Sequence, residues 1–150
     1  MKKAEIFLDS SALMAGIVSS QGAARVLLLL AEDEKIALLV SEQVIAEVER
    51  NIARKMPRAL PLVREMILRA NVQILRDPRP EEVQLRKNWI SHAADVPILV
   101  AAAAAKVGFL ATLNQRHFLD DPEVAKRSGL RIGTPGNALA WVRLRMIEDK

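Results

Sequence analysis

The chain has 150 residues, of which 51% are hydrophobic and 27% are charged, and this composition suits one compact domain with a sizeable core. It contains no cysteine, which excludes disulfide frameworks and thiolate metal sites and agrees with a reducing compartment. The net charge of +4 is unevenly spread, because residues 50 to 87 hold ten basic and four acidic side chains. This local excess favours a polyanionic partner, although the solvated face of two helices would explain it equally well.

The first residues argue against a membrane or export signal. Met1-Lys2-Lys3 resembles the basic start of a signal peptide, but Glu5 and Asp9 interrupt the apolar stretch that a signal sequence or a membrane span requires. We therefore expect a cytoplasmic protein with a single domain over residues 1–150 and no membrane association.

Short apolar runs alternate with segments of helical periodicity along the chain. This alternation predicts an α/β fold, with a central and mostly parallel sheet of about five strands flanked by helices. We expect strands at residues 4–9, 36–40, 72–75, 109–113 and 130–133. We expect helices at residues 11–18, 22–33, 42–55, 58–70, 81–90, 95–106 and 136–147.

Three acidic residues, Asp9, Glu47 and Asp95, each lie at the edge of an otherwise apolar element. Asp9 ends the first predicted strand, and Ser10-Ser11-Ala12-Leu13 then opens a helix. A carboxylate at the carboxyl end of a strand lies where open α/β sheets bind ligands. The three acids together indicate a divalent metal site, because carboxylates must bind the ion in a chain without cysteine.

Glu47 and Asp95 also have purely structural explanations. Glu47 belongs to a helix whose N-cap we expect at Ser41, and it lies about 60° around that helix from Val44. Its carboxylate can therefore reach over the rim of the sheet. Glutamates are nevertheless common at the boundary of an apolar stripe. Asp95 precedes an apolar helix with Pro97 in its first turn, and a capping role would explain it completely.

A family resemblance joins these features. Residues 7–13, residues 41–47, Asp95 and residues 109–118 resemble, in order and spacing, the PIN-domain nucleases, particularly the VapC-like toxins of VapBC-type toxin–antitoxin pairs. Ile132-Gly133-Thr134-Pro135 before a last helix is similar too, so the resemblance covers nearly the whole chain. It implies a three-layer fold, an acidic pocket that binds Mg²⁺ or Mn²⁺, and hydrolysis of RNA phosphodiester bonds. It also implies a homodimer and a cognate antitoxin.

The resemblance assigns roles to individual residues. Asp9, Glu47 and Asp95 match the first three acids of the family, and Ser11 and Thr112 match hydroxyls that support the pocket. Our hypothesis is that Asp9 and Asp95 hold the principal ion and that Glu47 positions its water or a second ion. Thr112, with the residue at the fourth acidic position, is expected to orient the ligands.

The chain departs from the family at that fourth position, which falls on Asn114, and at a further acidic position three residues later, which holds His117. Asparagine can offer a carbonyl oxygen but no charge, so a second ion should bind more weakly. The departure leaves open a different class of function, a degenerate PIN-like module that binds RNA or protein without cutting.

Two other mechanisms compete with metal catalysis. His92 and His117 could act as acid and base in metal-independent RNA cleavage, although both lie in polar segments where exposed histidines are ordinary. Asp9 could accept a phosphoryl group, but Ser11 stands where haloacid-dehalogenase-like phosphatases need a second Asp.

The basic excess fits an RNA substrate. Arg50, Arg54, Lys55 and Arg58 follow Glu47 on and beyond its predicted helix, and we expect them to contact the RNA backbone without reading its sequence. The apolar run at residues 27–30 is wider than a simple helical stripe and is either core or a partner interface.

Overall fold

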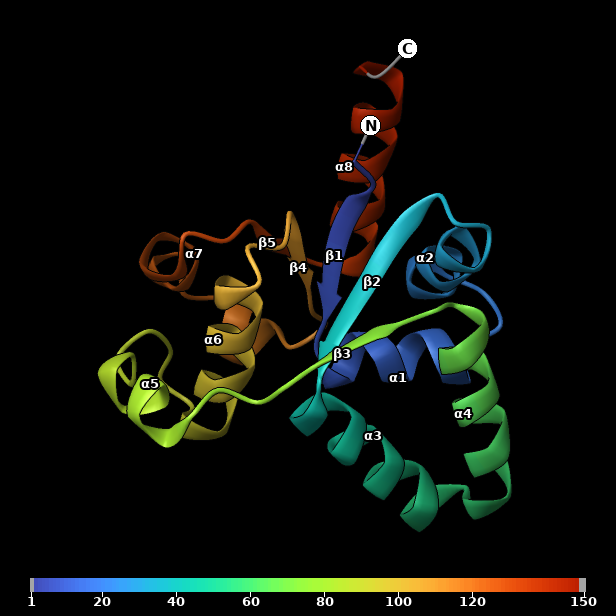
Figure 1. The fold of residues 1–150 in the computed structure, drawn as a ribbon, viewed down its shortest axis with the longest axis horizontal. Coiled ribbons are helices and arrows are strands. Elements are labelled where there is room, and N and C mark those ends of the chain that lie inside the picture. The colour runs from blue at the N-terminus through green and yellow to red at the C-terminus, as the bar shows by residue number, and fades with distance from the viewer. Residues whose placement is uncertain (1, 149–150) are drawn as a thin grey trace.

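A five-stranded, wholly parallel sheet forms the centre of the protein in the computed structural model, which describes residues 2–148 (Figure 1). The strand order is β3-β2-β1-β4-β5, so the chain starts in the middle strand and builds outward in both directions. The predicted fold class is confirmed. The strands are β1 (Ala4–Leu8), β2 (Ile36–Ser41), β3 (Gln73–Leu75), β4 (Phe109–Ala111) and β5 (Ile132–Gly133).

Eight α-helices surround this sheet. Right-handed crossovers toward β3 carry α1 to α4 over one face, and crossovers toward β5 carry α5 to α7 over the other. The contacts agree, because α2 packs against α8 whereas α6 packs against α5 and α7. The helices are α1 (Ser10–Val18), α2 (Ala23–Glu32), α3 (Glu42–Lys55), α4 (Leu60–Arg69), α5 (Pro80–Leu85), α6 (Val96–Ala104), α7 (Glu123–Ser128) and α8 (Pro135–Glu148), with single turns η1 (Pro57–Ala59), η2 (Ala93–Asp95) and η3 (Gln115–Leu119).

The core lies on both faces of the central strands. Three consecutive β1 residues, Ile6, Phe7 and Leu8, are buried, as expected for a parallel strand covered on both sides. Helix α3 buries the stripe that contains Val44 and Val48, and Ser41 caps this helix by accepting a hydrogen bond from the Val44 amide at 3.3 Å. The apolar run of the first strand and the stripe of α3 therefore fix where Asp9 and Glu47 emerge.

Most predicted elements are confirmed with shifts of a few residues, but two predictions near the sheet edge were wrong. The helix expected at residues 81–90 ends at Leu85, because α5 buries no side chain and Ile90 is instead drawn into the core beyond it. Helix α7 was not predicted, although it follows Pro122 and ends at Ser128, just before Gly129, whose φ of 73° suits glycine.

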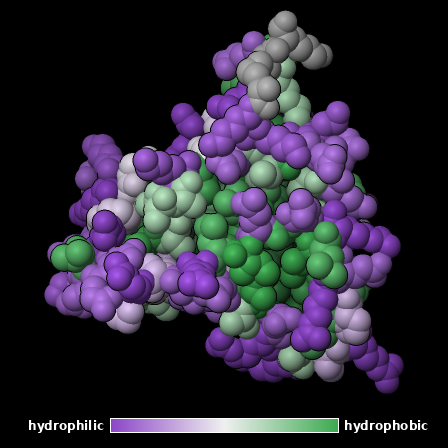
Figure 2. All heavy atoms as spheres, in the orientation of Figure 1, coloured by the Kyte–Doolittle hydropathy of each residue, from purple (hydrophilic) through white to green (hydrophobic). Residues whose placement is uncertain are grey.

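The apolar run at residues 27–30 lies partly in the core and partly at the surface. Leu27 and Leu28 are buried, whereas Leu29 is 54% exposed and lines an open groove between α2 and α4 together with Leu62. Figure 2 shows apolar side chains gathered near the middle of one face, over the region framed by α1, α3 and α4. Within residues 2–148, no single helix is long and apolar enough to cross a membrane; α1 and α2 meet that criterion only as a pair bent by 84°.

Candidate active site

The buried polar side chains of residues 2–148 stand at the carboxyl ends of three neighbouring strands. Asp9 follows β1, Ser41 ends β2 and Thr112 follows β4. The chain leaves β1 and β4 in opposite directions, which opens the crevice where parallel sheets bind ligands. The sheet topology therefore brings Asp9 and Thr112 together, although 103 positions separate them in the sequence.

Asp9 is 4% exposed, and hydrogen bonds hold both of its carboxylate oxygens. Oδ1 accepts from the Ser11 hydroxyl at 2.7 Å and from the Ala12 amide at 2.9 Å, so Asp9 also caps α1. Oδ2 accepts from the Thr112 hydroxyl. A carboxylate offers about four acceptor positions. Three are used, and the remaining one on Oδ2 is available for a ligand.

The surroundings of Asp9 disfavour its negative charge. Burial raises the pKa of the Asp9 carboxyl above its ordinary value of 3.8. The hydrogen bonds from Thr112, Ala12 and Ser11 oppose this rise, whereas the nearby negative charge of Asp95 adds to it. A bound cation would stabilise the ionised form of Asp9.

Ser11 and Thr112 connect the loops that follow β1 and β4. Each hydroxyl donates a hydrogen bond to Asp9 and accepts one from a backbone amide after β4. Ser11 accepts from the Leu113 amide at 2.9 Å, and Thr112 accepts from the Asn114 amide at 2.9 Å. The two residues matched to supporting hydroxyls thus hold Asp9 in one rotamer.

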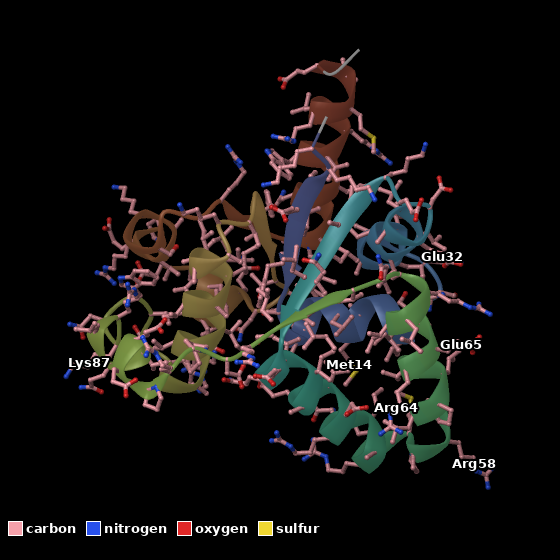
Figure 3. The ribbon with its side chains drawn as sticks, viewed as in Figure 1. Met14, Glu32, Arg58, Arg64, Glu65 and Lys87 are labelled. Atoms are coloured by element: carbon pink, nitrogen blue, oxygen red, sulfur yellow. The ribbon has the colours of Figure 1, made fainter. Side chains whose placement is uncertain are left out.

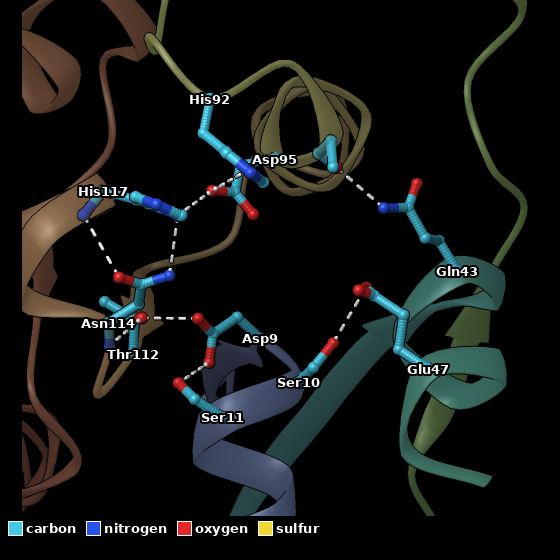
Figure 4. A network of polar contacts seen from close by, with 11 residues as sticks. Asp9, Ser10, Ser11, Gln43, Glu47, His92, Asp95, Thr112, Asn114 and His117 are labelled. Atoms are coloured by element: carbon cyan, nitrogen blue, oxygen red, sulfur yellow. Dashed lines mark hydrogen bonds and ion pairs between the residues drawn. The ribbon is translucent and has the colours of Figure 1, made fainter. Parts of the chain in front are cut away.

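Glu47 lies on the half-buried edge of α3 and faces the start of α1 (Figure 4). Its Oε1 accepts a hydrogen bond from the Ser10 hydroxyl at 3.0 Å. Ser10 was not predicted as a site residue, because a serine at a helix start has an ordinary explanation. The contact orients the Glu47 carboxylate toward the Asp9 end of the pocket.

Asp95 occupies the N-cap position of α6 as expected, but the explanation of its side chain as a cap was wrong. The 3₁₀ turn η2 gives the residue a helical backbone, and its carboxylate makes no capping hydrogen bond. Instead Oδ2 lies 2.8 Å from His117 Nδ1 and 3.2 Å from His92 Nδ1. The acid is therefore free of a structural task in α6 and is held by two imidazoles.

Both histidines line the pocket; His92 is exposed, as expected, whereas His117 is half-buried. The His92 and His117 rings stack with centroids 4.1 Å apart and planes inclined by 17°. Two sequence spacings could have indicated this arrangement. His92 precedes Asp95 by three residues, and His117 follows Asn114 by three, so that single turns bring each pair together.

Asn114 organises the turn after β4. Its Oδ1 accepts from the His117 amide at 3.1 Å, which caps the turn η3, and its Nδ2 lies 2.9 Å from His117 Nδ1. Both amide atoms thus face His117. The asparagine at the fourth acidic position orients this histidine in addition to any contact with a ligand.

These side chains line one open pocket of about 380 Å³. Figure 4 shows the acids and histidines converging on it from α1, α3, the start of α6 and the turn after β4. The complete lining is Asp9, Ser10, Ser11, Met14, Glu47, Asn51, Lys55, His92, Asp95, Ile98, Asn114 and His117. We call this the acidic pocket.

The predicted RNA-contacting residues divide into two groups. Lys55 lines the acidic pocket, and Arg54 donates a hydrogen bond to Asn51 on its rim at 3.1 Å. Arg50 and Arg58 are exposed and do not line it.

The basic excess of residues 50–87 does not form one patch. Figure 3 shows Arg58 and Lys87 on opposite sides of the molecule. Part of the remaining charge is paired, because Arg64, Arg69 and Arg79 form ion pairs with neighbouring glutamates at 2.7 to 3.1 Å. The charge near the pocket is therefore smaller than the composition suggested.

The fold and the pocket together define a class, the parallel α/β proteins with a carboxylate pocket at the sheet's switch point. The family model of the PIN domain matches residues 5–116, and the chain belongs to this family. The resemblance deduced from the sequence is confirmed at this level. No curated protein matches the chain in a sequence search.

Solved structures with the same fold include toxin–antitoxin proteins. VapBC2 of Rickettsia felis, solved bound to a DNA fragment from its promoter, has a TM-score of 0.62 at 18% identity, with 87% of this chain and 98% of that one covered. Mycobacterium tuberculosis VapC20, described as a sarcin-ricin loop cleaving toxin, has a TM-score of 0.56 at 14% identity, with coverages of 74% and 91%. PAE2754 of Pyrobaculum aerophilum has a TM-score of 0.63 at 18% identity, with coverages of 94% and 96%.

Proposed function

We propose that this protein is a metal-dependent endoribonuclease, the toxin of a toxin–antitoxin pair, which hydrolyses RNA phosphodiester bonds in its acidic pocket. The observation that carries the proposal is the convergence of Asp9, Glu47 and Asp95 on one open pocket in a PIN-domain chain. Three carboxylates would repel a phosphodiester by themselves, so the reaction needs a cation between them.

The residues of the pocket fit Mg²⁺ or Mn²⁺. Asp9 keeps one acceptor position on Oδ2, and Asp95 Oδ1 has no hydrogen bond within residues 2–148. Glu47 uses only Oε1 for Ser10. Oxygen donors of this kind are those that Mg²⁺ and Mn²⁺ prefer. When bound, such an ion neutralises the phosphate and lowers the pKa of a coordinated water.

The protein's own groups would divide the work. Asp9 and Asp95 hold the principal ion, and Glu47, on the α3 side, orients the attacking water or a second ion. Ser11 and Thr112 hold the Asp9 side chain in the rotamer that would bind the ion. Ion binding would therefore cost no further conformational entropy of this side chain. Asn114 contributes through the turn η3, since both of its amide atoms face His117.

Lys55 is the cation best placed to hold RNA, because it lines the same pocket as the acids. Its ammonium group would contact a backbone phosphate beside the scissile bond, and Arg54 would extend this contact along the rim of α3. Arg50 and Arg58 would act only on a longer RNA that follows α3 outward.

The proposed partners are an antitoxin and a second copy of the chain, both acting in the cytoplasm. Support comes from the R. felis relative, whose structure is of a VapBC pair on promoter DNA. The exposed apolar side chains of the groove between α2 and α4 leave apolar surface that such a partner can cover.

A cleavage assay tests the proposal directly. Purified protein, freed of any bound partner, is incubated with a mixed pool of structured RNA in Mg²⁺, in Mn²⁺ and in chelator. We expect cleavage only with metal and no cleavage by Asp95→Asn. Cleavage that persists in chelator would favour the two histidines as acid and base instead.

A non-catalytic RNA-binding module is the second candidate, favoured by the commitment of Asn114 to His117. RNA binding through Lys55 without cleavage under any condition would identify it.

A further inference from the structure

The two histidines of the acidic pocket converge on a single oxygen atom. His92 Nδ1 lies 3.2 Å and His117 Nδ1 lies 2.8 Å from Asp95 Oδ2 (Figure 4). The three potential ligand atoms lie within 4.8 Å of one another. We propose that His92, Asp95 and His117 form a second metal subsite, which binds a transition metal ion such as Mn²⁺, Co²⁺ or Zn²⁺ in preference to Mg²⁺.

The spacing of these atoms matches the edges of a coordination shell. Ligands about 2.0 to 2.1 Å from an ion are separated by about 2.9 Å in cis positions of an octahedron and by about 3.3 Å in a tetrahedron. The two separations from Asp95 Oδ2, 2.8 and 3.2 Å, fall close to these values. The two stacked rings, whose planes are inclined by only 17°, would have to rotate apart so that both Nδ1 lone pairs point at one ion.

The two contacts of His117 Nδ1 make opposite demands on its proton. Nδ1 lies 2.9 Å from the Asn114 amide nitrogen, a donor, and 2.8 Å from an Asp95 oxygen, an acceptor. A protonated Nδ1 opposes the amide N–H groups, whereas a bare Nδ1 opposes the carboxylate lone pair. An ion bound by both Nδ1 and Oδ2 would turn the contact with Asp95 into an attraction.

The donor set decides which ion is preferred. Imidazole nitrogen suits Zn²⁺, Co²⁺ and other transition ions, whereas Mg²⁺ favours oxygen ligands and keeps much of its water. Three protein ligands also leave an open position toward the pocket, as in catalytic zinc sites. His92 has 49% of its side chain exposed, so an ion can enter from solvent.

The subsite occupies the side of the pocket where Asn114 and His117 replace the acids typical of the family. It shares only Asp95 with the oxygen-donor site proposed for the principal ion. Its contribution to RNA cleavage rests on the proposed function, whereas its metal binding does not.

Binding of Co²⁺ tests the proposal with a readout other than activity. The chain has two histidines and no cysteine, so imidazole signals shifted by paramagnetic Co²⁺ in proton NMR have only His92 and His117 as sources, provided that the protein carries no polyhistidine tag. We expect two such signals at one equivalent of Co²⁺, displaced by Zn²⁺ but not by equimolar Mg²⁺. His92→Gln and His117→Gln should each remove one signal and weaken Co²⁺ binding by about tenfold or more.

Glu81→Gln, at an exposed carboxylate of α5 outside the pocket, is the matched control and should bind Co²⁺ as the parent does. Two results would overturn the subsite. One is the absence of shifted imidazole signals from a folded protein, and the other is a Co²⁺ affinity in both histidine variants that equals the parent's. Intact Mg²⁺-dependent RNA cleavage in that case would leave the proposed function standing. Imidazole-bound Co²⁺ without RNA cleavage in any metal would instead support the subsite and contradict the nuclease.

Discussion

The two halves of the acidic pocket are built in different ways. The strand-end half, made of Asp9, Ser11 and Thr112, is buried or half-buried and is joined by hydrogen bonds to the backbone of α1 and of the segment that follows β4. The histidine half, made of His92, Asp95 and His117, is more exposed and consists of side-chain contacts between single turns. The sheet fixes the first half, whereas the second can rearrange around a ligand at low cost.

Replacement of Asp9 should have the largest effect. Asp9→Asn keeps the size of the side chain but removes the charge that we propose binds the principal ion. Loss of an outer-shell partner of a metal costs about 10- to 100-fold in activity, so loss of this direct ligand should exceed about 100-fold. Initial rates of RNA cleavage in saturating Mg²⁺ measure it. Near-parental activity would move the principal ion away from the strand-end half.

Thr112→Val should follow in size. Valine fills the same buried space but leaves Asp9 Oδ2 without its donor and the Asn114 amide without its acceptor. We expect Mg²⁺ affinity to fall by about 10- to 100-fold, measured by calorimetric titration. Thr112→Ser, which keeps the hydroxyl, is the control. Equal losses in both variants would assign Thr112 to packing rather than to orientation of Asp9.

Removal of the Lys55 charge should have a smaller effect that depends on salt. Lys55→Gln deletes one proposed phosphate contact, so the slope of log affinity for single-stranded RNA against log salt should decrease in magnitude by about 0.7. Binding in chelator, which prevents cleavage, gives the slope. Lys35→Gln, at an exposed lysine outside the pocket, is the control. An identical slope in the Lys55 variant would exclude this contact.

The smallest effect concerns stability. Because the pKa of Asp9 is raised in the folded protein, the folded state binds more protons than the unfolded state between pH 3.8 and the raised value, and stability falls as pH rises through that interval. Asp9→Asn removes this loss. In chelator, the melting temperature of the variant minus that of the parent should therefore be higher at neutral pH than below pH 3.8. A difference that does not change with pH would contradict the raised pKa.

The limits of prediction follow the same division between the two halves. Asp9 was predictable because a charged residue directly after a buried apolar strand has few structural explanations. Its neighbour Thr112 could be matched only through the family resemblance, since no local pattern relates two loops 103 positions apart. The contact of His117 with Asp95 was missed because no local pattern relates two residues 22 positions apart.

The sequence by itself determined the alternating elements, the strand that ends at Asp9 and the helix that carries Glu47, because hydrophobic periodicity and capping act over a few residues. Membership of the PIN domain family also followed from the order of these local motifs. Only the tertiary structure decided that Asp95 faces two histidines rather than capping its helix, and that of the four predicted RNA contacts only Lys55 lines the pocket. These features depend on how turns from distant parts of the chain pack at one end of the sheet.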